Sequence, residues 1–435
     1  MIKSGQRWRN WSGIVQATPQ QVIYPGSTEE IVDAVRLCRR ESRTLRVVGS
    51  GHSFTAVAAS DDVLLSLDRM QGIVSVDAES CTAIVWAGTK LKALGELLHA
   101  EGLAQENLGD IDVQSIAGAI STGTHGTGLQ FGNIATQVVG MTIVTGTAEV
   151  LTCTEQSHPE LFKSLQISLG ALAVIVQVTL RLRPAYKLSY ESTRDSLSAC
   201  LQRLDSLSAM HRHFELYWFP YAEPCQLKFM NETDQPVTSR KISSYISDVI
   251  LENAAFGALS GICRRAPKLS ATVSRICAAT VPTNGKVEYS HRLFATQRLV
   301  RFNEMEYNLP VEAMEPVIRE MREKMALNKY NVHFPIECRF AKGDHIWLSP
   351  AYERDSAYIA VHMYKGMPHE IFFADMEQIF LSYGGRPHWG KLHTLNAEQL
   401  SRSYPMWDSF QQFRAKLDPD GIFLNDYLRR VFAVS

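Results

Sequence analysis

The stretch Val47–Phe54, VVGSGHSF, decides how this sequence is interpreted. It places Gly49 and Gly51 on either side of a serine and follows them at once with His52. Glycine permits backbone conformations that other residues avoid, and it lets another group come close to the main chain. Taken alone, an imidazole on such a turn is compatible with a ligand, an acid or base, a covalent attachment point or an ordinary turn residue.

The residues before the glycines predict a β-α-β unit. Ser27 and Glu30 have the spacing of a capping box, and apolar residues then recur at helical intervals as far as Cys38. The run Leu45–Val48 is short and apolar, which predicts a buried strand. The glycine turn therefore follows the carboxyl end of a strand.

A second loop of small residues, GTHGTG at Gly123–Gly128, lies further along the chain. Neither loop is a dinucleotide fingerprint or a P-loop, because Phe54 stands where a third glycine is needed and no Gly-Lys-Ser/Thr follows the second loop. Unobstructed N–H groups can still form an anion nest, and nearby hydroxyls add donors. These hydroxyls belong to Ser50, Ser53, Ser121, Thr122 and Thr124. Either loop alone is explained by a tight turn, but the pair predicts a large diphosphate cofactor held from two sides.

Bulk composition narrows the class of protein. A chain of 435 residues is too long for one ordinary core, so two domains are expected. Lys and Arg total 44 against 45 for Asp and Glu, which gives no electrostatic reason to expect nucleic acid as a partner. The eight cysteines form no CxxC pair, so we expect no metal site and reduced thiols in a cytoplasmic protein.

No segment predicts insertion into a membrane. The amino terminus lacks an apolar run long enough for a secretory signal. The most apolar stretch, Ser247–Cys263, is interrupted by Glu252 and Asn253, and it is too short and too polar to span a bilayer. We expect it to form a partly buried helix.

The character of the sequence changes after Pro184. Long charged helical stretches and strictly alternating strands appear there, and they continue to Lys391. The tail contains a Pro-Asp-Gly turn and is expected to return to the first region. The predicted fold class is α+β, with a first domain over residues 1–184, a second α+β domain over 185–391, and a tail, 392–435, that packs on the first.

One strand of the second domain carries an opposed charged pair. In VHFPIECRFA, Glu337 and Arg339 project from one face, because side chains two residues apart share a face. The other face is apolar and consists of Phe334, Ile336, Cys338 and Phe340. The residues alone leave two alternatives open: a surface salt bridge, which contributes little, or the wall of a polar pocket.

Two further stretches place polar residues near this strand. In DSAYIAVHMYKG, Tyr358, His362 and Tyr364 share a face that either completes a pocket wall or makes structural hydrogen bonds. In RPHWGK, proline and glycine constrain the backbone around His388, and Lys391 follows. By itself Lys391 would be interpreted as a solvated surface lysine.

Together these motifs resemble the vanillyl-alcohol oxidase superfamily of flavoproteins, over nearly the whole chain. Three stretches are similar to its PCMH-type FAD-binding domain: VVGSGHSF, NLGDIDVQSIAGAISTGTHGTG and GALAVIVQVTLRLRP, in that order. FPIECRF and RPHWGK resemble the sugar-1,4-lactone oxidases of the D-arabinono- and L-gulono-lactone type, and the alditol oxidases. The resemblance implies a second domain that forms a cap over the flavin.

The resemblance also implies the cofactor and its contacts. FAD is expected to be bound covalently through His52, at the 8α carbon of the flavin ring, with a non-covalent contact as the alternative. The residues implied to contact the cofactor are Gly49, Ser50, Gly51, His52, Ser53, Gly109, Asp110, Gly118, Ser121, Thr122, Gly123, Thr124, His125, Gly126, Val174, Ile175 and His388.

The implied reaction is oxidation of a CH–OH group of an aldono-1,4-lactone, with a hydride moved to flavin N5 and oxygen or another acceptor reoxidising the flavin. Glu337 and Arg339 are expected to hold substrate hydroxyls, and Lys391 to stabilise the developing alkoxide. The group that takes the hydroxyl proton stays open. The alternatives are an alditol oxidase producing an aldose and hydrogen peroxide, a non-catalytic flavin-binding redox partner, and a nicotinamide-dependent dehydrogenase, which the missing third glycine disfavours.

Overall fold

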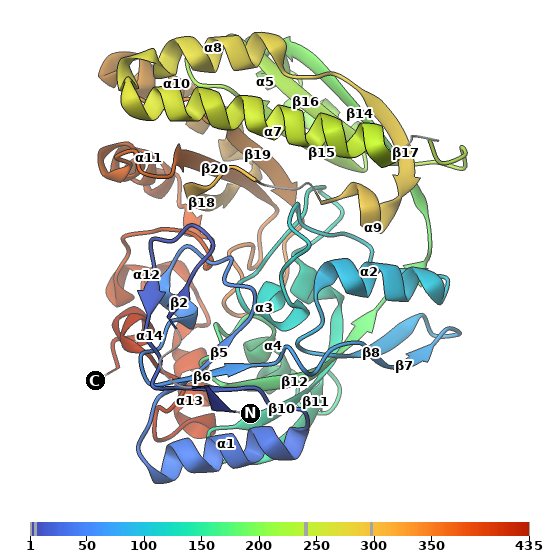
Figure 1. Ribbon diagram of the computed structural model, residues 1–435, viewed down its shortest axis with the longest axis vertical. Coiled ribbons are helices and arrows are strands. Elements are labelled where there is room, and N and C mark those ends of the chain that lie inside the picture. The colour runs from blue at the N-terminus through green and yellow to red at the C-terminus, as the bar shows by residue number, and fades with distance from the viewer. Residues whose placement is uncertain (1, 4–6, 239–241, 296–298, 435) are drawn as a thin grey trace.

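The computed structural model describes every residue except 1, 4–6, 239–241, 296–298 and 435 (Figure 1). A four-stranded sheet holds the first glycine loop. Its order is β1-β4-β6-β5, and β4, β6 and β5 run parallel. The strands are β1 (Ile2–Lys3), β4 (Gln21–Ile23), β5 (Leu45–Val48) and β6 (Val63–Ser66).

The predicted β-α-β unit is confirmed, with one strand inserted. Helix α1 (Thr28–Arg40) begins at Ser27, whose side chain accepts a hydrogen bond from the backbone N–H of Glu30. It joins β4 to β5, but β6 lies between these two strands in the sheet. The glycine loop therefore leaves β5 at an outer strand of the sheet, where a ligand can approach it.

A second, antiparallel sheet has the order β11-β10-β12-β8-β7. Its strands are β7 (Ile73–Asp77), β8 (Thr82–Trp86), β10 (Val138–Thr145), β11 (Val150–Thr154) and β12 (Ala173–Arg181). Strands β10 and β11 form an antiparallel hairpin around Gly146. The helices of this region are α2 (Leu91–Ala100), α3 (Ile116–Ser121) and α4 (Pro159–Gln166), with the 3-10 helices η1 (Ala56–Ala58) and η2 (Ile134–Gln137). Two short strand pairs complete the region: β2 (Trp8–Arg9) pairs with β3 (Gln16–Ala17), and β9 (Leu103–Ala104) pairs with β13 (Arg183–Pro184).

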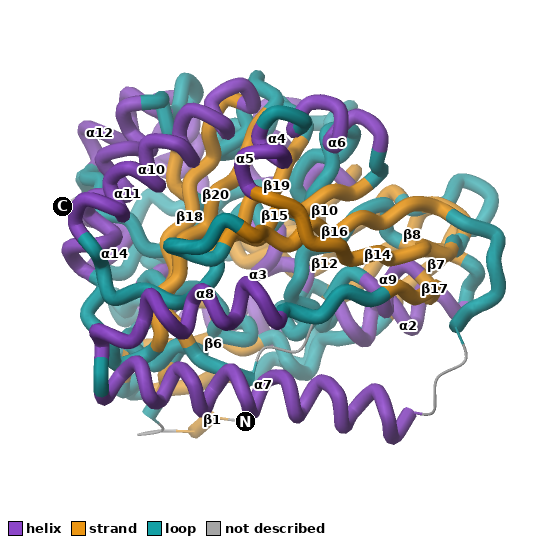
Figure 2. The backbone as a smooth tube through the Cα atoms, turned by 90° about the horizontal axis from the view of Figure 1, so that it is seen from above, coloured by secondary structure: helices purple, strands orange, loops and turns teal. Residues whose placement is uncertain are grey.

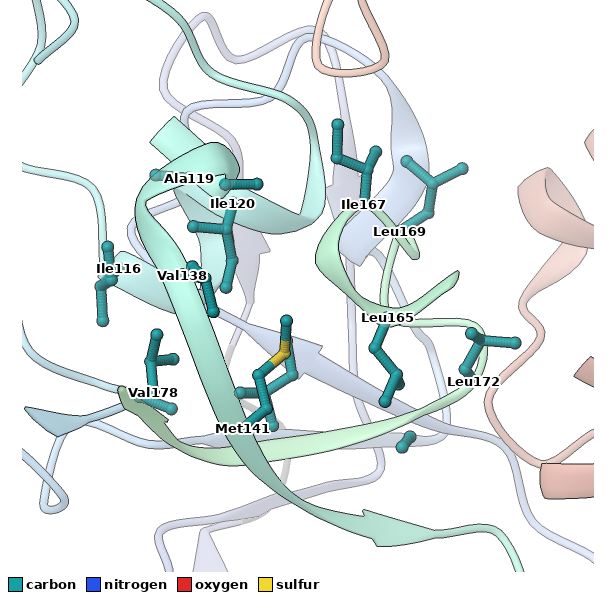
Figure 3. Close-up of a cluster of buried hydrophobic side chains, with 14 of the residues drawn as sticks. Ile116, Ala119, Ile120, Val138, Met141, Leu165, Ile167, Leu169, Leu172 and Val178 are labelled. Carbon is teal, nitrogen blue, oxygen red and sulfur yellow. The ribbon is translucent and has the colours of Figure 1, made fainter. Parts of the chain in front are cut away.

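Helices α3 and α4 pack on the second sheet and enclose part of the main hydrophobic core (Figure 3). Ile120 of α3, Met141 of β10 and Leu165 of α4 are almost completely buried there. Each large side chain buried in this way contributes roughly 1.5–3 kcal/mol to stability. The core fixes α3 directly behind the second glycine loop, which starts where the helix ends.

The second region is built on an eight-stranded antiparallel sheet of order β17-β14-β16-β15-β19-β20-β18-β21. Its strands are β14 (Lys187–Ser196), β15 (His213–Trp218), β16 (Pro224–Glu232), β17 (Gly285–Tyr289), β18 (Phe302–Pro310), β19 (Ile336–Ala341), β20 (Ser356–Tyr364) and β21 (Arg386–Pro387). Its helices are α5 (Leu197–Leu201), α6 (Leu204–Met210), α7 (Ile242–Arg265), α8 (Ser270–Thr280), α9 (Ser290–Leu293), α10 (Met314–Asn328) and α11 (Glu370–Ser382), with 3-10 turns η3 (Pro267–Leu269) and η4 (Val311–Ala313).

This sheet lies between its helices α7, α8 and α10 and the first region, whereas α9 packs against α2 of the first region. Figure 1 shows α7, α8 and α10 on the far side of the sheet, and Figure 2 shows α7 and α8 side by side along one edge. Ile336, Cys338 and Phe340 of β19 pack into the core on the helix side. The alternating residues Glu337 and Arg339 therefore point to the opposite face, toward the glycine loops. The strand begins at Ile336, later than the alternation of the sequence predicts.

The C-terminal helices α12 (Ala397–Ser403), α13 (Trp407–Leu417) and α14 (Asp426–Phe432) pack into the same core as the two N-terminal sheets. Figure 1 shows these red segments beside the blue N-terminal elements. The side-chain amide of Asn425 donates to the carbonyls of Ala56 (2.8 Å) and Ala59 (2.7 Å), just after the first glycine loop. Among the described helices, none combines the length and the apolar character needed to cross a bilayer.

Candidate active site

A cleft of about 970 Å³ runs along the first glycine loop, between β5 and the start of α3. Gly49 has no room for a side chain, because a Cβ there would lie 2.7 Å from Ser115 Oγ, the cap of α3. Gly51 adopts a φ of +69°, in the left-handed region that favours glycine. The loop thus lies close against the N-terminus of α3, and both line the cleft, an arrangement suited to a phosphate.

Arg46 fixes the floor of this cleft. Its buried guanidinium donates to the carbonyls of Val57 (2.9 Å), Leu169 (2.7 Å) and Gly170 (2.8 Å), and also to that of Phe423. Burial lowers the pKa of Arg46 to about 10, so the group stays charged at neutral pH. One side chain thereby connects β5, the loop before β12 and the C-terminal segment around the cleft.

His52 stands at the inner end of the cleft. Its ring stacks on Trp11, with centroids 5.6 Å apart and an interplanar angle of 23°. Burial, followed by the nearby Lys391 ammonium, lowers the pKa of His52 to about 4. The imidazole is therefore neutral at physiological pH and keeps a nitrogen lone pair available for bond formation.

A second, polar pocket of about 630 Å³ continues from this end of the cleft. Four residues line both spaces: His52, Ser53, Gln114 and Thr122. The buried Oε1 of Gln114 has no hydrogen-bond partner among the described residues. The shared residues make the two spaces continuous, with room for an elongated ligand.

Arg339 is the centre of one charged cluster in the polar pocket. Its Nε donates to Glu215 at 3.1 Å, its Nη2 forms an ion pair with Glu337, and Asp110 Oδ2 lies 3.7 Å from Nη2. Tyr217, in contact with the same strand, is buried beside them, and burial raises its pKa well above the usual value. The three carboxylates, Glu337 foremost, raise the pKa of Arg339 against the effect of burial, so the guanidinium is permanently charged.

Lys391 is the centre of a second cluster. Its Nζ lies 2.5 Å from Glu304 Oε2 and 3.9 Å from Glu306 Oε2, both on β18. Burial alone would raise the pKa of Glu304, but Lys391 and then His362 outweigh it and lower that pKa to about 2. The ammonium of Lys391 also lies 5.2 Å from the centre of the Phe54 ring. Lys391 is therefore held inside the pocket and is not a solvated surface lysine.

Two histidines bridge these glutamates to backbone carbonyls. His125 contacts the Gly126 carbonyl at 2.8 Å and Glu306 Oε1 at 3.1 Å. His362 contacts the Pro335 carbonyl at 2.9 Å and Glu304 Oε1 at 3.4 Å. A carbonyl oxygen can only accept a hydrogen bond. In each histidine, the ring nitrogen that contacts the backbone carbonyl therefore carries a proton, and the other ring nitrogen contacts the carboxylate.

His388 completes the wall between the two clusters. Its Nδ1 accepts a hydrogen bond from the Gly390 N–H at 3.0 Å, and burial lowers its pKa to about 3. Ring and carboxylate atoms of His125, Glu306 and His388 approach within 4.8 Å of one another. The Glu306 carboxylate is already bonded to His125 and faces Lys391, so we interpret Glu306 and His125 as a hydrogen-bonded pair with the His388 ring beside it.

The structure gathers most of the residues that the sequence singled out. All but three of the residues expected to contact the cofactor or to act on the substrate line the cleft or the polar pocket. The exceptions are Gly123, Gly126 and Val174: Val174 lies in the core, and Gly126 packs directly under Leu108. The Tyr358 ring stacks on the His125 ring behind the pocket wall, with the ring centroids 3.6 Å apart, whereas His362 lines the pocket itself.

Sequence reasoning missed the acidic partners of the two cations. Glu304 and Glu306 alternate on β18, and Glu215 lies on β15. A signal for the first two exists, since two glutamates at a spacing of two residues lie within the strand-like run FNEMEYNLP. Glu215 has no comparable signal, because its partner Arg339 lies 124 residues away.

Comparison with known proteins now assigns the family. The profile of the D-arabinono-1,4-lactone oxidase family matches residues 178–431, and that of an FAD-binding domain matches residues 19–154. The chain belongs to this lactone oxidase family. It is 39% identical to an L-gulono-1,4-lactone dehydrogenase of Mycobacterium tuberculosis (strain H37Rv), over 98% of each chain. It is 32% identical to the L-gulonolactone oxidase of Bos taurus, again over 98% of each chain.

More distant relatives agree. A D-arabinono-1,4-lactone oxidase of Candida glabrata is 27% identical over 96% of this chain and 94% of its own. The crystal structure of cholesterol oxidase from B. sterolicum superposes with a TM-score of 0.81 at 18% identity, covering 99% and 97% of the two chains, which shows the shared fold. The family member described here is therefore an FAD-dependent oxidoreductase with a PCMH-type α+β fold.

Proposed function

We propose that this enzyme oxidises a CH–OH group of an aldono-1,4-lactone of the D-arabinono, L-gulono or L-galactono type. The observation that carries the proposal is the continuity between the cofactor cleft and a pocket that holds two buried cations. Gln114 and Thr122 line both spaces, so a substrate in the pocket lies next to the inner end of the cofactor. The names of the relatives point to the same class of substrate.

The side chains of the pocket have complementary roles in this reaction. Glu337 accepts hydrogen bonds from substrate hydroxyls, and Arg339, fixed by its carboxylates, donates to substrate oxygens. Lys391, held by Glu304, places positive charge where an alkoxide develops as the hydroxyl proton leaves. When bound, FAD supplies the acceptor for the hydrogen and electrons removed from the substrate carbon. Because these charges are fixed, they reorganise little during the reaction. Much of the rate enhancement arises from this preorganisation.

The charge balance of the pocket favours an uncharged substrate. Five carboxylates, those of Asp110, Glu215, Glu304, Glu306 and Glu337, surround Arg339 and Lys391. Protonation of the two bridging histidines would still leave no net positive charge. A lactone or polyol is neutral and can use these groups as hydrogen-bond partners, whereas the carboxylate of an open-chain aldonate would be repelled.

His52 is the proposed point of covalent attachment to the flavin. Its pKa of about 4 leaves the ring neutral and nucleophilic, and stacking on Trp11 limits its rotation. It also lines both the cofactor cleft and the substrate pocket, which is where the reactive ring of the cofactor must end.

We also infer a domain division at Pro184 and Lys391 and a cytoplasmic location. The division is supported by a second core built mainly from residues 197–380 and by the packing of residues 395–432 on the first core, although that first core also includes side chains of 185–391 such as Leu188 and Trp347. The location is supported by eight free cysteines, seven of them buried, as expected in a reducing compartment.

The function is tested by mixing the purified holoenzyme with substrates in the absence of oxygen. L-gulono-, L-galactono- and D-arabinono-1,4-lactone should bleach the flavin absorbance, and the corresponding sodium aldonates should not. Bleaching by xylitol or sorbitol with no response to lactones would instead identify an alditol oxidase. If none of these compounds reduces the flavin, the chain is a redox scaffold. Oxygen uptake compared with reduction of a dye then distinguishes an oxidase from a dehydrogenase.

Covalent attachment needs its own test. Acid precipitation should give a yellow pellet for the native enzyme and a yellow supernatant for His52→Ala. His158→Ala, which alters an exposed histidine far along the chain, is the matched control and should keep its flavin in the pellet. Flavin in the supernatant of the native enzyme would show that His52 contacts the cofactor without a bond.

A further inference from the structure

A groove of about 1040 Å³ lies outside the active site, between α7 and the ends of β18 and β20. Its walls combine positive charge with apolar surface. Arg264, Arg301 and Lys365 supply the charge, and Leu299, which is 55% exposed, lies beside them with Val300. Neither the glycine loops nor the pocket around Arg339 and Lys391 contributes to this groove.

A fourth cation stands at one end of the groove. A Cβ added to Gly13 would lie 2.5 Å from Lys365 Nζ and 3.2 Å from Arg9 Cδ, which brings these two side chains together over the same glycine. The Lys365 N–H donates to the Arg301 carbonyl at 3.1 Å, and the Arg264 side chain lies against Gly366. The four cations therefore converge from β2, α7, the segment before β18 and the end of β20.

Carboxylates whose side chains the structure describes do not balance these cations. Over residues 7–238, 253–295 and 299–434, no Asp or Glu forms an ion pair with Arg9, Arg264, Arg301 or Lys365. Several other surface arginines are paired with a carboxylate, as Arg183 is with Glu232 and Arg292 is with Glu96. Burial, then Arg301 and Arg9, lower the pKa of Lys365, which is the expected result of placing like charges together.

We propose that this groove is an anion-binding site for a phosphate group attached to an apolar body. Arginine and lysine are the side chains that proteins use for phosphate, and an anion would relieve the repulsion among the four cations. Leu299 and Val300 offer apolar surface beside the charges, which an inorganic ion alone would not use. The same chemistry is presented by a soluble organic phosphate and by the headgroup of an anionic phospholipid.

The groove lies close to the active site along shared strands. Phe302 pairs with Tyr364 in the β18–β20 ladder, and Phe302 and His362 line the substrate pocket. Tyr364 lines the groove, two residues beyond His362. A ligand in the groove would therefore contact the same end of β20 that carries His362, just beyond the substrate pocket, and it does not compete with the lactone for space.

The site is tested on the holoenzyme, so that FAD fills its own phosphate-binding cleft. The melting temperature is measured in potassium phosphate and in potassium chloride of equal ionic strength, and binding to phosphatidylglycerol and phosphatidylcholine vesicles is measured by sedimentation. The Arg301→Gln/Lys365→Gln double variant should lose the response. Arg69→Gln/Lys92→Gln, which removes two exposed cations elsewhere, is the matched control and should respond as the native enzyme does.

The outcomes distinguish a soluble organic phosphate from a phospholipid headgroup as the ligand of the groove. A phosphate-specific rise in melting temperature without sedimentation assigns the groove to a soluble phosphate. Sedimentation with phosphatidylglycerol alone, weakened about tenfold or more in the double variant, assigns it to a lipid headgroup. The proposal is overturned if neither probe binds above its control, or if the double variant binds as well as the native enzyme. Unchanged flavin absorbance and lactone oxidation in the double variant show that its fold is intact.

Discussion

The cofactor cleft and the substrate pocket meet at Gln114, yet they are built on different principles. The cleft is formed largely by backbone and small residues around Gly49 and Gly51, where the absence of a side chain matters most. The pocket is formed by long charged side chains from the eight-stranded sheet and from the segment after β21, each held by a partner of opposite charge, as Arg339 and Lys391 are. The cleft should therefore be sensitive to added atoms, and the pocket to lost charge.

Removing the charge at the centre of the pocket should have the largest effect. Arg339→Ala leaves Glu337, Glu215 and Asp110 without their shared cation, and buried unpaired charges are costly. We expect a loss of about 3–5 kcal/mol in stability and a decrease of about 10³-fold or more in kcat/KM. Urea unfolding and steady-state kinetics with the preferred lactone measure the two effects.

Two further variants serve as comparisons for Arg339→Ala. Arg339→Lys keeps the charge but not the planar fork, and it should recover stability more fully than activity. Arg319→Ala removes an exposed pair with Glu315 on α10 and should change stability by no more than about 0.5 kcal/mol. An Arg339→Ala enzyme that retains kcat/KM within tenfold of the native value would show that the cluster is structural only.

Adding a single methyl group near the second glycine loop should have the next largest effect. A Cβ at Gly126 would lie 2.3 Å from the Leu108 carbonyl oxygen and 2.5 Å from Asn107 Oδ1, so the backbone must move. We expect Gly126→Ala to cost about 3 kcal/mol and to weaken retention of FAD. Gly261→Ala, where nothing lies within 4 Å of the added atom, is the control and should be neutral or slightly stabilising. Equal stabilities for the two variants would contradict the close packing under this loop.

The sequence predicted the cleft better than the pocket for a physical reason. Leu45–Val48, the glycines and the cap at Ser27 are local features, and local spacing fixes what they do. Glu337 and Arg339 were placed on one face by the two-residue period of a strand, which is also local. Local spacing does not determine the first and last residues of that strand, because the ends of a strand depend on contacts with residues distant in the sequence.

The acidic half of the pocket depends on strand register, which local sequence does not contain. Glu304 meets Lys391 because β18 pairs with β20 so that Glu304 faces His362, and because the chain returns at β21 beside it. Glu215 meets Arg339 because β15 pairs with β19 over a separation of more than a hundred residues. Only the assembled sheet shows that both cations are shared by several carboxylates.

The dependence of folding stability on acid pH should test whether the cap and the FAD-binding region unfold as one unit. Burial lowers the pKa of His333, in the cap, and of His393, beside the C-terminal helices, to about 4. Each histidine is neutral when folded but takes up a proton below pH 6.5 when unfolded, so stability falls as the pH drops from 6.5 toward 4. Each should remove about 2 kcal/mol of stability between pH 7 and pH 5.

His333→Gln and His393→Gln should each reduce this acid sensitivity by about 2 kcal/mol, while the exposed His345→Gln should leave it unchanged. Urea midpoints at pH 7 and pH 5 measure the difference. If the cap and the FAD-binding region unfold together, both variants alter the same single transition. If two transitions appear and each variant alters only one, the cofactor cleft and the substrate pocket belong to separately stable units, and their junction at Gln114 is held by the ligand more than by the protein.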